Sequence, residues 1–219
     1  MKQQENSPHP DDLRSGLSLV LLGNLLVVLA SLLISRAVPT SVHQAGAVAA
    51  VAGALLLLIG RWTLTDQSQD YLASLVYLGM AWAVSLIFSA PDLAEWLVRY
   101  LPRQLSSAYV NWMSVIWTTA LAVVPAALRL ASLVLFLRAT NDLLWSGRSG
   151  AEEETRKLTG RGRIAAAILC AGTAAGGLLE AAGAPAAASV TLELLSRILW
   201  LFYLYDSRRA LASRGRSET

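Results

Sequence analysis

The stretch AAASVTLELLSRILWLFYLY, from Ala186 to Tyr205, decides the fold class of this chain. As one helix it is long enough to cross about 30 Å of hydrocarbon, at a rise of about 1.5 Å per residue. Yet Glu193 and Arg197 lie one helical turn apart near its middle. A charge at the centre of a membrane helix costs about 2.5–3.5 kcal/mol on insertion scales. The pair therefore needs polar partners from the rest of the chain.

The composition of the whole chain indicates the same environment. Of its 219 residues, 55% are hydrophobic and 15% are charged, whereas a soluble domain carries about 25% charged residues. The apolar residues come in continuous blocks of roughly 20, and not in the ten-residue alternations of barrel strands. The sequence therefore predicts an all-α membrane protein built as a bundle of six transmembrane helices.

The predicted organisation has six spans separated by polar segments. The spans cover residues 17–38, 45–60, 71–89, 110–137, 164–183 and 186–205. The polar segments are a cytoplasmic tail at 1–16, a cytoplasmic loop at 138–163 and a basic cytoplasmic tail at 206–219. Between the third and fourth spans, a short stretch from Pro91 to Pro102 gathers its apolar residues on one helical face. This pattern predicts an interfacial amphipathic helix rather than another span.

The distribution of lysine and arginine indicates how the spans are threaded. On the side of the termini and the 138–163 loop lie 13 of the 18 basic residues, including Arg61 in a short loop after the second span. Three lie on the other side, and Arg129 and Arg197 lie inside spans. Basic residues concentrate in cytoplasmic segments. We therefore expect a multi-pass protein of a cell membrane, of the bacterial inner-membrane type, with both termini cytoplasmic and the lipid bilayer as its main partner.

Four ionisable residues inside the predicted spans form the candidate site: Arg129, Glu180, Glu193 and Arg197. Arg129 lies on a face of the fourth span that also carries Ser132. Counted from the cytoplasmic boundary, Arg129 and Arg197 should both lie at about 13 Å depth, with Glu193 about 6 Å further out. Because four unpaired charges would be hard to tolerate in a bilayer, we predict that they face one another or water.

The last two spans are predicted to form an antiparallel hairpin, because only a minimal turn at Ala184-Pro185 separates them. This pairing places Arg197 opposite Gly172 and Glu193 opposite Gly176. The two glycines are predicted helix-packing residues that leave room for the long side chains of the facing helix.

Three interpretations of the charged residues are open. They form a structural ion-pair cluster that fixes helix packing, or a midplane site that binds a small anionic or zwitterionic solute or relays protons, or Arg129 simply extends to the cytoplasmic surface. In the second interpretation, Glu180 is the preferred proton carrier. The predicted function is accordingly a small solute transporter, or a membrane-embedded binding component of one. The alternative is a non-catalytic scaffold or accessory subunit that contacts other membrane subunits.

No pattern in the sequence is typical of an enzyme, a metal site or a nucleic-acid interface. The only histidines are His9 and His43, and HExxH and GxSxG motifs are absent. The TGRGR stretch at 159–163 lacks the spacing of a phosphate-binding loop. The net charge of +3 arises from basic loops and tails, which suit anionic lipid headgroups. We expect no catalytic residues, no cofactor or metal, and no nucleic-acid partner.

Overall fold

The computed structural model describes residues 10–34, 40–89, 107–146, 152–181 and 186–212, and within these ranges the regular structure is helical. The α-helices are α1 Pro10–Ile34, α2 Thr40–Thr63, α3 Gln69–Ser89, α5 Ser107–Ser146, α6 Glu152–Ala181 and α7 Ala186–Ala212. One turn of 3-10 helix, η1 Thr65–Gln67, links α2 to α3. For the described residues the all-α prediction is confirmed, whereas the predicted interfacial helix lies outside them.

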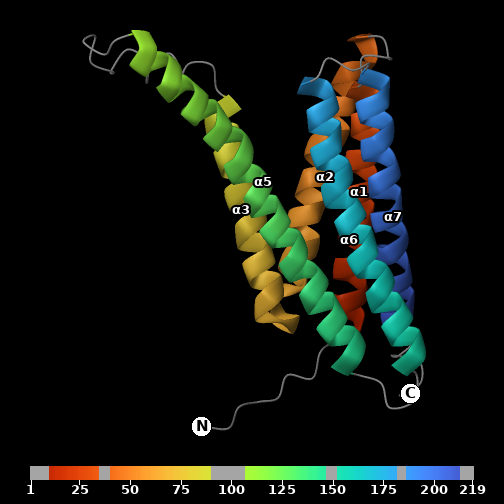
Figure 1. Cartoon of the computed structure of the whole chain (residues 1–219). Coiled ribbons are helices and arrows are strands. Elements are labelled where there is room, and N and C mark those ends of the chain that lie inside the picture. Colours follow the sequence, from red (N-terminus) through yellow and green to blue (C-terminus); the bar gives the residue numbers. More distant parts are fainter. Residues whose placement is uncertain (1–9, 35–39, 90–106, 147–151, 182–185, 213–219) are drawn as a thin grey trace.

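In the part of the chain that the structure describes, three helices are long and apolar enough to cross a membrane, which is compatible with the predicted membrane location. Within the described residues these segments are Asp12–Ile34, Val42–Gln67 and Val123–Ser146. Three segments, and not six, meet this criterion in that part of the chain. Successive helices run in opposite directions, so that α1 begins and α7 ends at the same end of the molecule (Figure 1).

The helices are longer than the spans predicted from the sequence. Most of the segment predicted as a loop at 138–163 is helical, because α5 continues to Ser146 and α6 begins at Glu152. Lys157 Nζ lies 2.6 Å from Glu153 Oε1 one turn away, a pairing that supports helix in polar sequence. At the other end of the chain, α1 begins at Pro10, inside the predicted tail. Proline is well suited to a first helical position.

Glycines bring α1 and α2 into direct backbone contact. A Cβ atom added at Gly23 would lie 2.8 Å from the carbonyl oxygen of Gly53, and one added at Gly53 would lie 2.9 Å from that of Gly23. Two turns away, a Cβ at Gly60 would lie 2.9 Å from the carbonyl oxygen of Gly16. Larger side chains would hold the backbones apart, so glycine at these positions permits the close packing typical of membrane helices.

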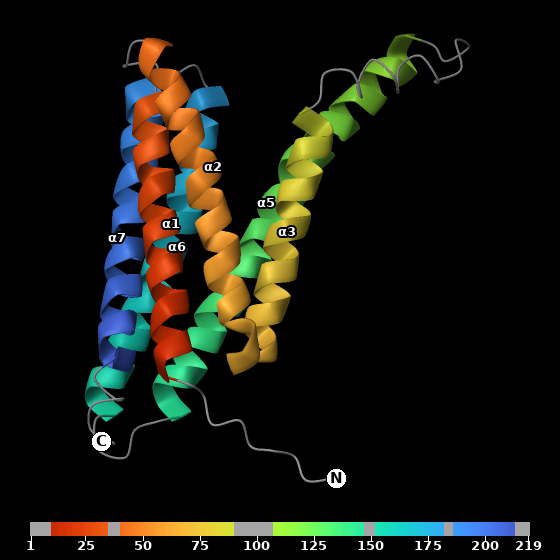
Figure 2. The ribbon, with the colours of Figure 1, turned by 180° about the vertical axis from the view of Figure 1, so that it is seen from behind.

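The six α-helices of the described residues divide into a four-helix bundle (α1, α2, α6 and α7) and a two-helix arm (α3 and α5). Within the bundle α1 contacts α2 and α7, and α6 contacts α7, while α3 packs along α5. The arm leans away from the bundle at one end and meets it at the end where α1 begins (Figures 1 and 2). We call this meeting point the junction. Its buried side chains include Tyr71, Phe136, Leu144, Trp200 and Tyr203.

Candidate functional site

A buried arginine lies at the centre of the junction. Arg61, near the end of α2, is only 8% exposed. Its Nη1 donates to the hydroxyl of Ser74 at 2.6 Å, to the carbonyl oxygen of Ser74 at 3.3 Å, and to the hydroxyl of Ser132. Its Cζ lies 4.9 Å from the ring centroid of Phe136, within cation–π range. One guanidinium therefore connects the bundle to both helices of the arm.

The sequence predicted Arg61 in a short polar loop after the second span, and the prediction of a loop is wrong. Helix α2 continues to Thr63, so Arg61 projects from a helix and is buried. The signal that could have revealed its role is the pair of serines at 74 and 132 in otherwise apolar stretches. Hydroxyls in apolar helices commonly bond across to a neighbouring helix. Nothing in the sequence alone pairs these two serines with each other or with Arg61.

The two serines also bond directly to each other's backbone. Ser74 Oγ donates to the carbonyl oxygen of Ser132 at 2.9 Å, and Ser132 Oγ donates to that of Ser74 at 2.7 Å. Both side chains are almost completely buried. This reciprocal pair joins α3 to α5 without help from Arg61. Each hydroxyl donates its hydrogen to a carbonyl oxygen, and its lone pairs can accept a hydrogen bond from the guanidinium.

A chain of aromatic rings extends the junction from the arm to α7. Phe136 contacts Tyr71 edge-on at 5.3 Å between centroids and Trp200 at 6.3 Å. Trp200 packs against Tyr203 at 5.2 Å, and the Tyr203 hydroxyl donates to Asn141 Oδ1 at 3.1 Å. Such aromatic pairs each contribute about 0.5–1.5 kcal/mol beyond the area that they bury. The arm is thus attached to α2 by hydrogen bonds and to α7 mainly by rings.

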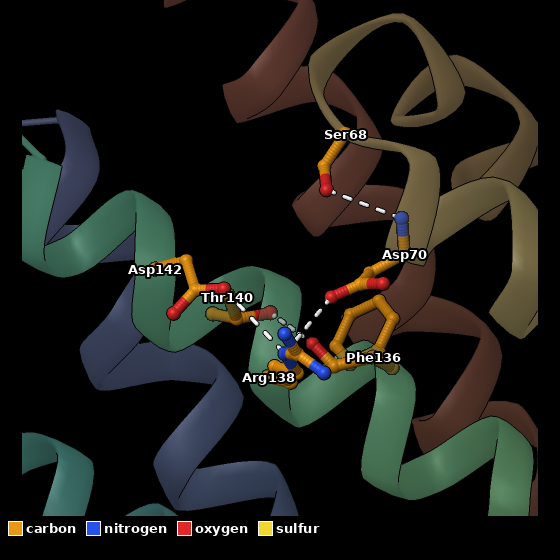
Figure 3. Close-up of polar contacts among 6 residues, drawn as sticks. All are labelled: Ser68, Asp70, Phe136, Arg138, Thr140 and Asp142. Carbon is orange, nitrogen blue, oxygen red and sulfur yellow. Dashed lines mark hydrogen bonds and ion pairs between the residues drawn. The ribbon is translucent and has the colours of Figure 1, made fainter.

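An ion pair between the exposed Arg138 and the half-buried Asp70 borders the junction. Arg138 Nε lies 3.3 Å from Asp70 Oδ2 on α3 and 3.9 Å from Asp142 Oδ2 on its own helix (Figure 3). The backbone N–H of Asp70 donates to Ser68 Oγ at 3.2 Å, which caps the start of α3. Behind this pair the buried hydroxyl of Thr140 donates to the carbonyl oxygen of Phe136 at 2.8 Å. Exposed ion pairs contribute only about 0–1 kcal/mol, so the buried groups dominate the attachment.

The structure places the four predicted charged residues on three helices. Arg129 on α5 is exposed, and its Nη2 donates to Ser85 Oγ on α3 at 3.1 Å. Arg197 is half-buried on α7. Glu180 and Glu193 lie on α6 and α7, but their side chains are outside the described part of the structure. The hydrogen bond between Arg129 and Ser85 therefore joins the two helices of the arm. A contact between Arg129 and either glutamate stays a prediction.

The register of α5 and α7 refines the relative depths. The two helices run in the same direction (Figure 1), and the Phe136–Trp200 and Asn141–Tyr203 contacts set an offset of about 62 to 64 residues. Arg129 is then level with the α7 backbone near residue 193. Arg197 lies about 6–9 Å nearer the junction at a rise of about 1.5 Å per residue.

Small residues mediate the contact between α6 and α7. A Cβ added at Gly172 would lie 2.6 Å from Ser196 Cβ, so Gly172 faces a residue next to the predicted Arg197. The surroundings of Gly176 lie outside the described residues. Gly162, in the TGRGR stretch, lies inside α6, and a Cβ there would collide with the ring of Tyr203. Gly162 is therefore part of the α6–α7 packing surface.

The described residues contain no group of three His, Cys, Asp or Glu side chains placed to hold a metal ion. The junction instead offers hydroxyls, carbonyl oxygens, aromatic rings and one guanidinium, a set suited to fixing helices or to closing a path between them. In comparisons with known proteins, the chain matched no family model, no curated protein and no solved structure.

Proposed function

We propose that this chain is a six-span integral membrane protein, with both termini cytoplasmic, that binds or transports a small anionic or zwitterionic solute between the arm and the bundle. The described helices support a bilayer location through their exposed apolar faces. On α2, large apolar side chains recur every three or four residues and are at least half exposed: Val48, Val51, Leu55 and Ile59. Contact with lipid tails would remove this surface from water, where so large an apolar patch is unusual.

The basic residues of the described helices support the orientation. The end of α5, the start of α6 and the end of α7 all lie at the junction end of the molecule (Figure 1). The basic residues near these helix ends are Arg138, Arg156, Lys157, Arg161, Arg208 and Arg209. An excess of basic residues is typical of the cytoplasmic ends of membrane helices. In this proposal the junction faces the cytoplasm, and the end where the arm leans away from the bundle faces outward.

The observation that carries the solute-binding part of the proposal is the exposure of Arg129. It lies inside the apolar segment Val123–Ser146, yet it is exposed and bonds to a neutral serine. An arginine facing lipid tails at that depth would cost several kcal/mol, so its surroundings should contain water or an anion. The space toward α7 is where Arg197 and the predicted Glu193 would complete a polar site. Below it, Arg61 and the aromatic rings close the cytoplasmic side.

The test is uptake by the purified chain in liposomes. The probes are radiolabelled amino acids and dicarboxylates, together with an internal pH-sensitive dye that reports proton movement under a valinomycin-driven potential. Arg129→Gln should reduce uptake or proton movement at least tenfold. The matched control is Arg138→Gln on the same helix, which removes an exposed ion pair outside the polar site and should leave uptake unchanged. If the wild-type chain moves none of these probes, or if Arg129→Gln behaves as wild type, the proposal fails.

The alternative is a scaffold or accessory subunit whose intramembrane charges only hold helices together. It is favoured by the partners of Arg61 and Arg129, since both arginines bond to serines of α3. A charge-swapped variant, Glu193→Arg with Arg197→Glu, separates the two functions. If Glu193→Gln with Arg197→Gln prevents assembly and the swapped pair restores it without any uptake, the cluster is structural.

A further inference from the structure

A polar hollow lies at the junction end, away from the charged residues inside the spans. The end of α5 and the first turns of α6 border an open hollow of about 720 Å³. Its lining residues are Trp145, Glu152, Glu153, Arg156, Thr159, Gly160 and Arg163. Neither the attachment of the arm nor the proposed solute site uses it.

Two arginines and a glycine of α6 line one side of the hollow. Arg156 and Arg163 are seven residues apart on α6 and therefore lie on one helical face, about 10 Å apart along the axis. Gly160 lies between them, and a Cβ added there would have no atom within 4 Å. The Thr159 hydroxyl donates to the carbonyl oxygen of Arg156 at 3.1 Å. A ligand can thus approach the helix backbone between two guanidinium groups.

The balance of charge in the hollow is positive. Glu153 is offset by Lys157, whose Nζ lies 2.6 Å from its carboxylate. This leaves the two arginines against Glu152 alone. Among the described residues, neither Arg156 nor Arg163 takes part in an ion pair. Paired guanidinium groups of this kind favour phosphate, which accepts charge-assisted hydrogen bonds from their planar donors.

The position of the hollow relative to the apolar segment of α5 bears on which kind of molecule would carry such a phosphate. Trp145 is 47% exposed and precedes the last residue of the apolar segment Val123–Ser146. Tryptophan is enriched at the depth of the lipid headgroups, where its ring contacts apolar material and its N–H contacts polar groups. The hollow therefore opens where the apolar part of α5 ends.

We propose that this hollow binds the phosphodiester headgroup of an anionic phospholipid of the cytoplasmic leaflet. Arg156 and Arg163 contact the phosphate, Gly160 permits its close approach, and Trp145 lies beside the glycerol backbone. The inference rests on the proposed membrane placement but not on transport of any solute. Extraction of membranes with alkaline carbonate tests that placement separately, since an integral protein stays in the pellet.

The experiment measures thermal unfolding of the purified full chain in detergent with added lipid. Phosphatidylglycerol should raise the Tm by several degrees, whereas phosphatidylcholine and inorganic phosphate should not. Arg156→Gln with Arg163→Gln should remove this shift and weaken phosphatidylglycerol binding at least tenfold. The matched control is Arg208→Gln with Arg209→Gln on α7, which removes the same charge at the same end and should keep the shift.

A second variant tests the shape of the hollow without changing its charge. Gly160→Leu fills the space between the arginines and replaces glycine by a better helix former, so the chain should fold and lose the lipid response. Equal shifts with phosphatidylcholine, or loss of the shift in the control, would show non-specific binding and overturn the proposal. A shift with inorganic phosphate that matches that of the lipid would identify a free-phosphate site instead.

Discussion

Removing the serines that bond to Arg61 should destabilise the protein far more than removing Arg61 itself. Arg61→Met takes a buried charge out of the junction and leaves an apolar side chain in place of the aliphatic stem of the arginine. The hydroxyls of Ser74 and Ser132 then keep their bonds to each other's carbonyl oxygens at 2.9 and 2.7 Å. The substitution also removes Nε, which has no hydrogen-bond partner within the described part of the chain.

The magnitudes follow from these contacts. Replacing a buried charge by an apolar group is often neutral or stabilising, because the desolvation penalty disappears with the charge. We therefore expect Arg61→Met to change the free energy of unfolding by less than about 1.5 kcal/mol, although it also removes the cation–π interaction with Phe136. Ser74→Ala with Ser132→Ala removes two hydroxyl acceptors of the guanidinium, each worth about 1.5–3 kcal/mol. The buried charge then keeps only a carbonyl at 3.3 Å, so the double variant should lose at least about 3 kcal/mol.

The assay is unfolding of the purified chain in mixed micelles by added SDS, followed by circular dichroism. The triple variant, Arg61→Met with both serine substitutions, completes a double-mutant cycle. It should be more stable than the serine double variant, because the buried charge without hydroxyl partners is gone. The remaining costs are those of two interhelical hydroxyl bonds, about 0.6 kcal/mol each, and of the cation–π interaction with Phe136. A cost above about 3 kcal/mol for Arg61→Met alone would refute this reasoning. A triple variant no more stable than the serine double variant would refute it as well.

Four further substitutions test the packing of the helices, all by the same unfolding assay. Gly23→Ala should destabilise by about 1–3 kcal/mol because its Cβ would meet the Gly53 carbonyl oxygen, whereas Gly79→Ala, with no atom within 4 Å, should be neutral or stabilise by up to about 1 kcal/mol. Equal effects at the two positions would contradict the close contact of α1 and α2. Gly162→Ala should cost about 1–3 kcal/mol through collision with the Tyr203 ring, and a stabilised variant would show that α6 and α7 pack differently. Arg138→Gln should change stability by less than about 1 kcal/mol, because its ion pairs are exposed, and a larger loss would mean that they are shielded from solvent.

The candidate site was only partly predictable for a physical reason. Charges inside apolar stretches are visible in a sequence, so Arg129 and Arg197 could be singled out. Arg61 lies at the end of such a stretch, where an arginine usually contacts headgroups or water, and nothing local distinguishes a buried one. Its partners come from 13 and 71 positions away in the chain. Contacts over such separations depend on which helices become neighbours.

The sequence by itself determined the helical class, the apolar character of the chain and the antiparallel order of its helices. These follow from hydropathy and from short connections, which act locally along the chain. Only the tertiary structure decided that α3 and α5 form an arm, that this arm meets the bundle at one end, and that Arg61 is buried there. Helix pairing is hard to read from the pattern because the lipid-facing and helix-facing sides of a membrane helix are both apolar. The pairing depends instead on close fits, such as Gly23 against Gly53, and on a few buried hydrogen bonds between distant serines.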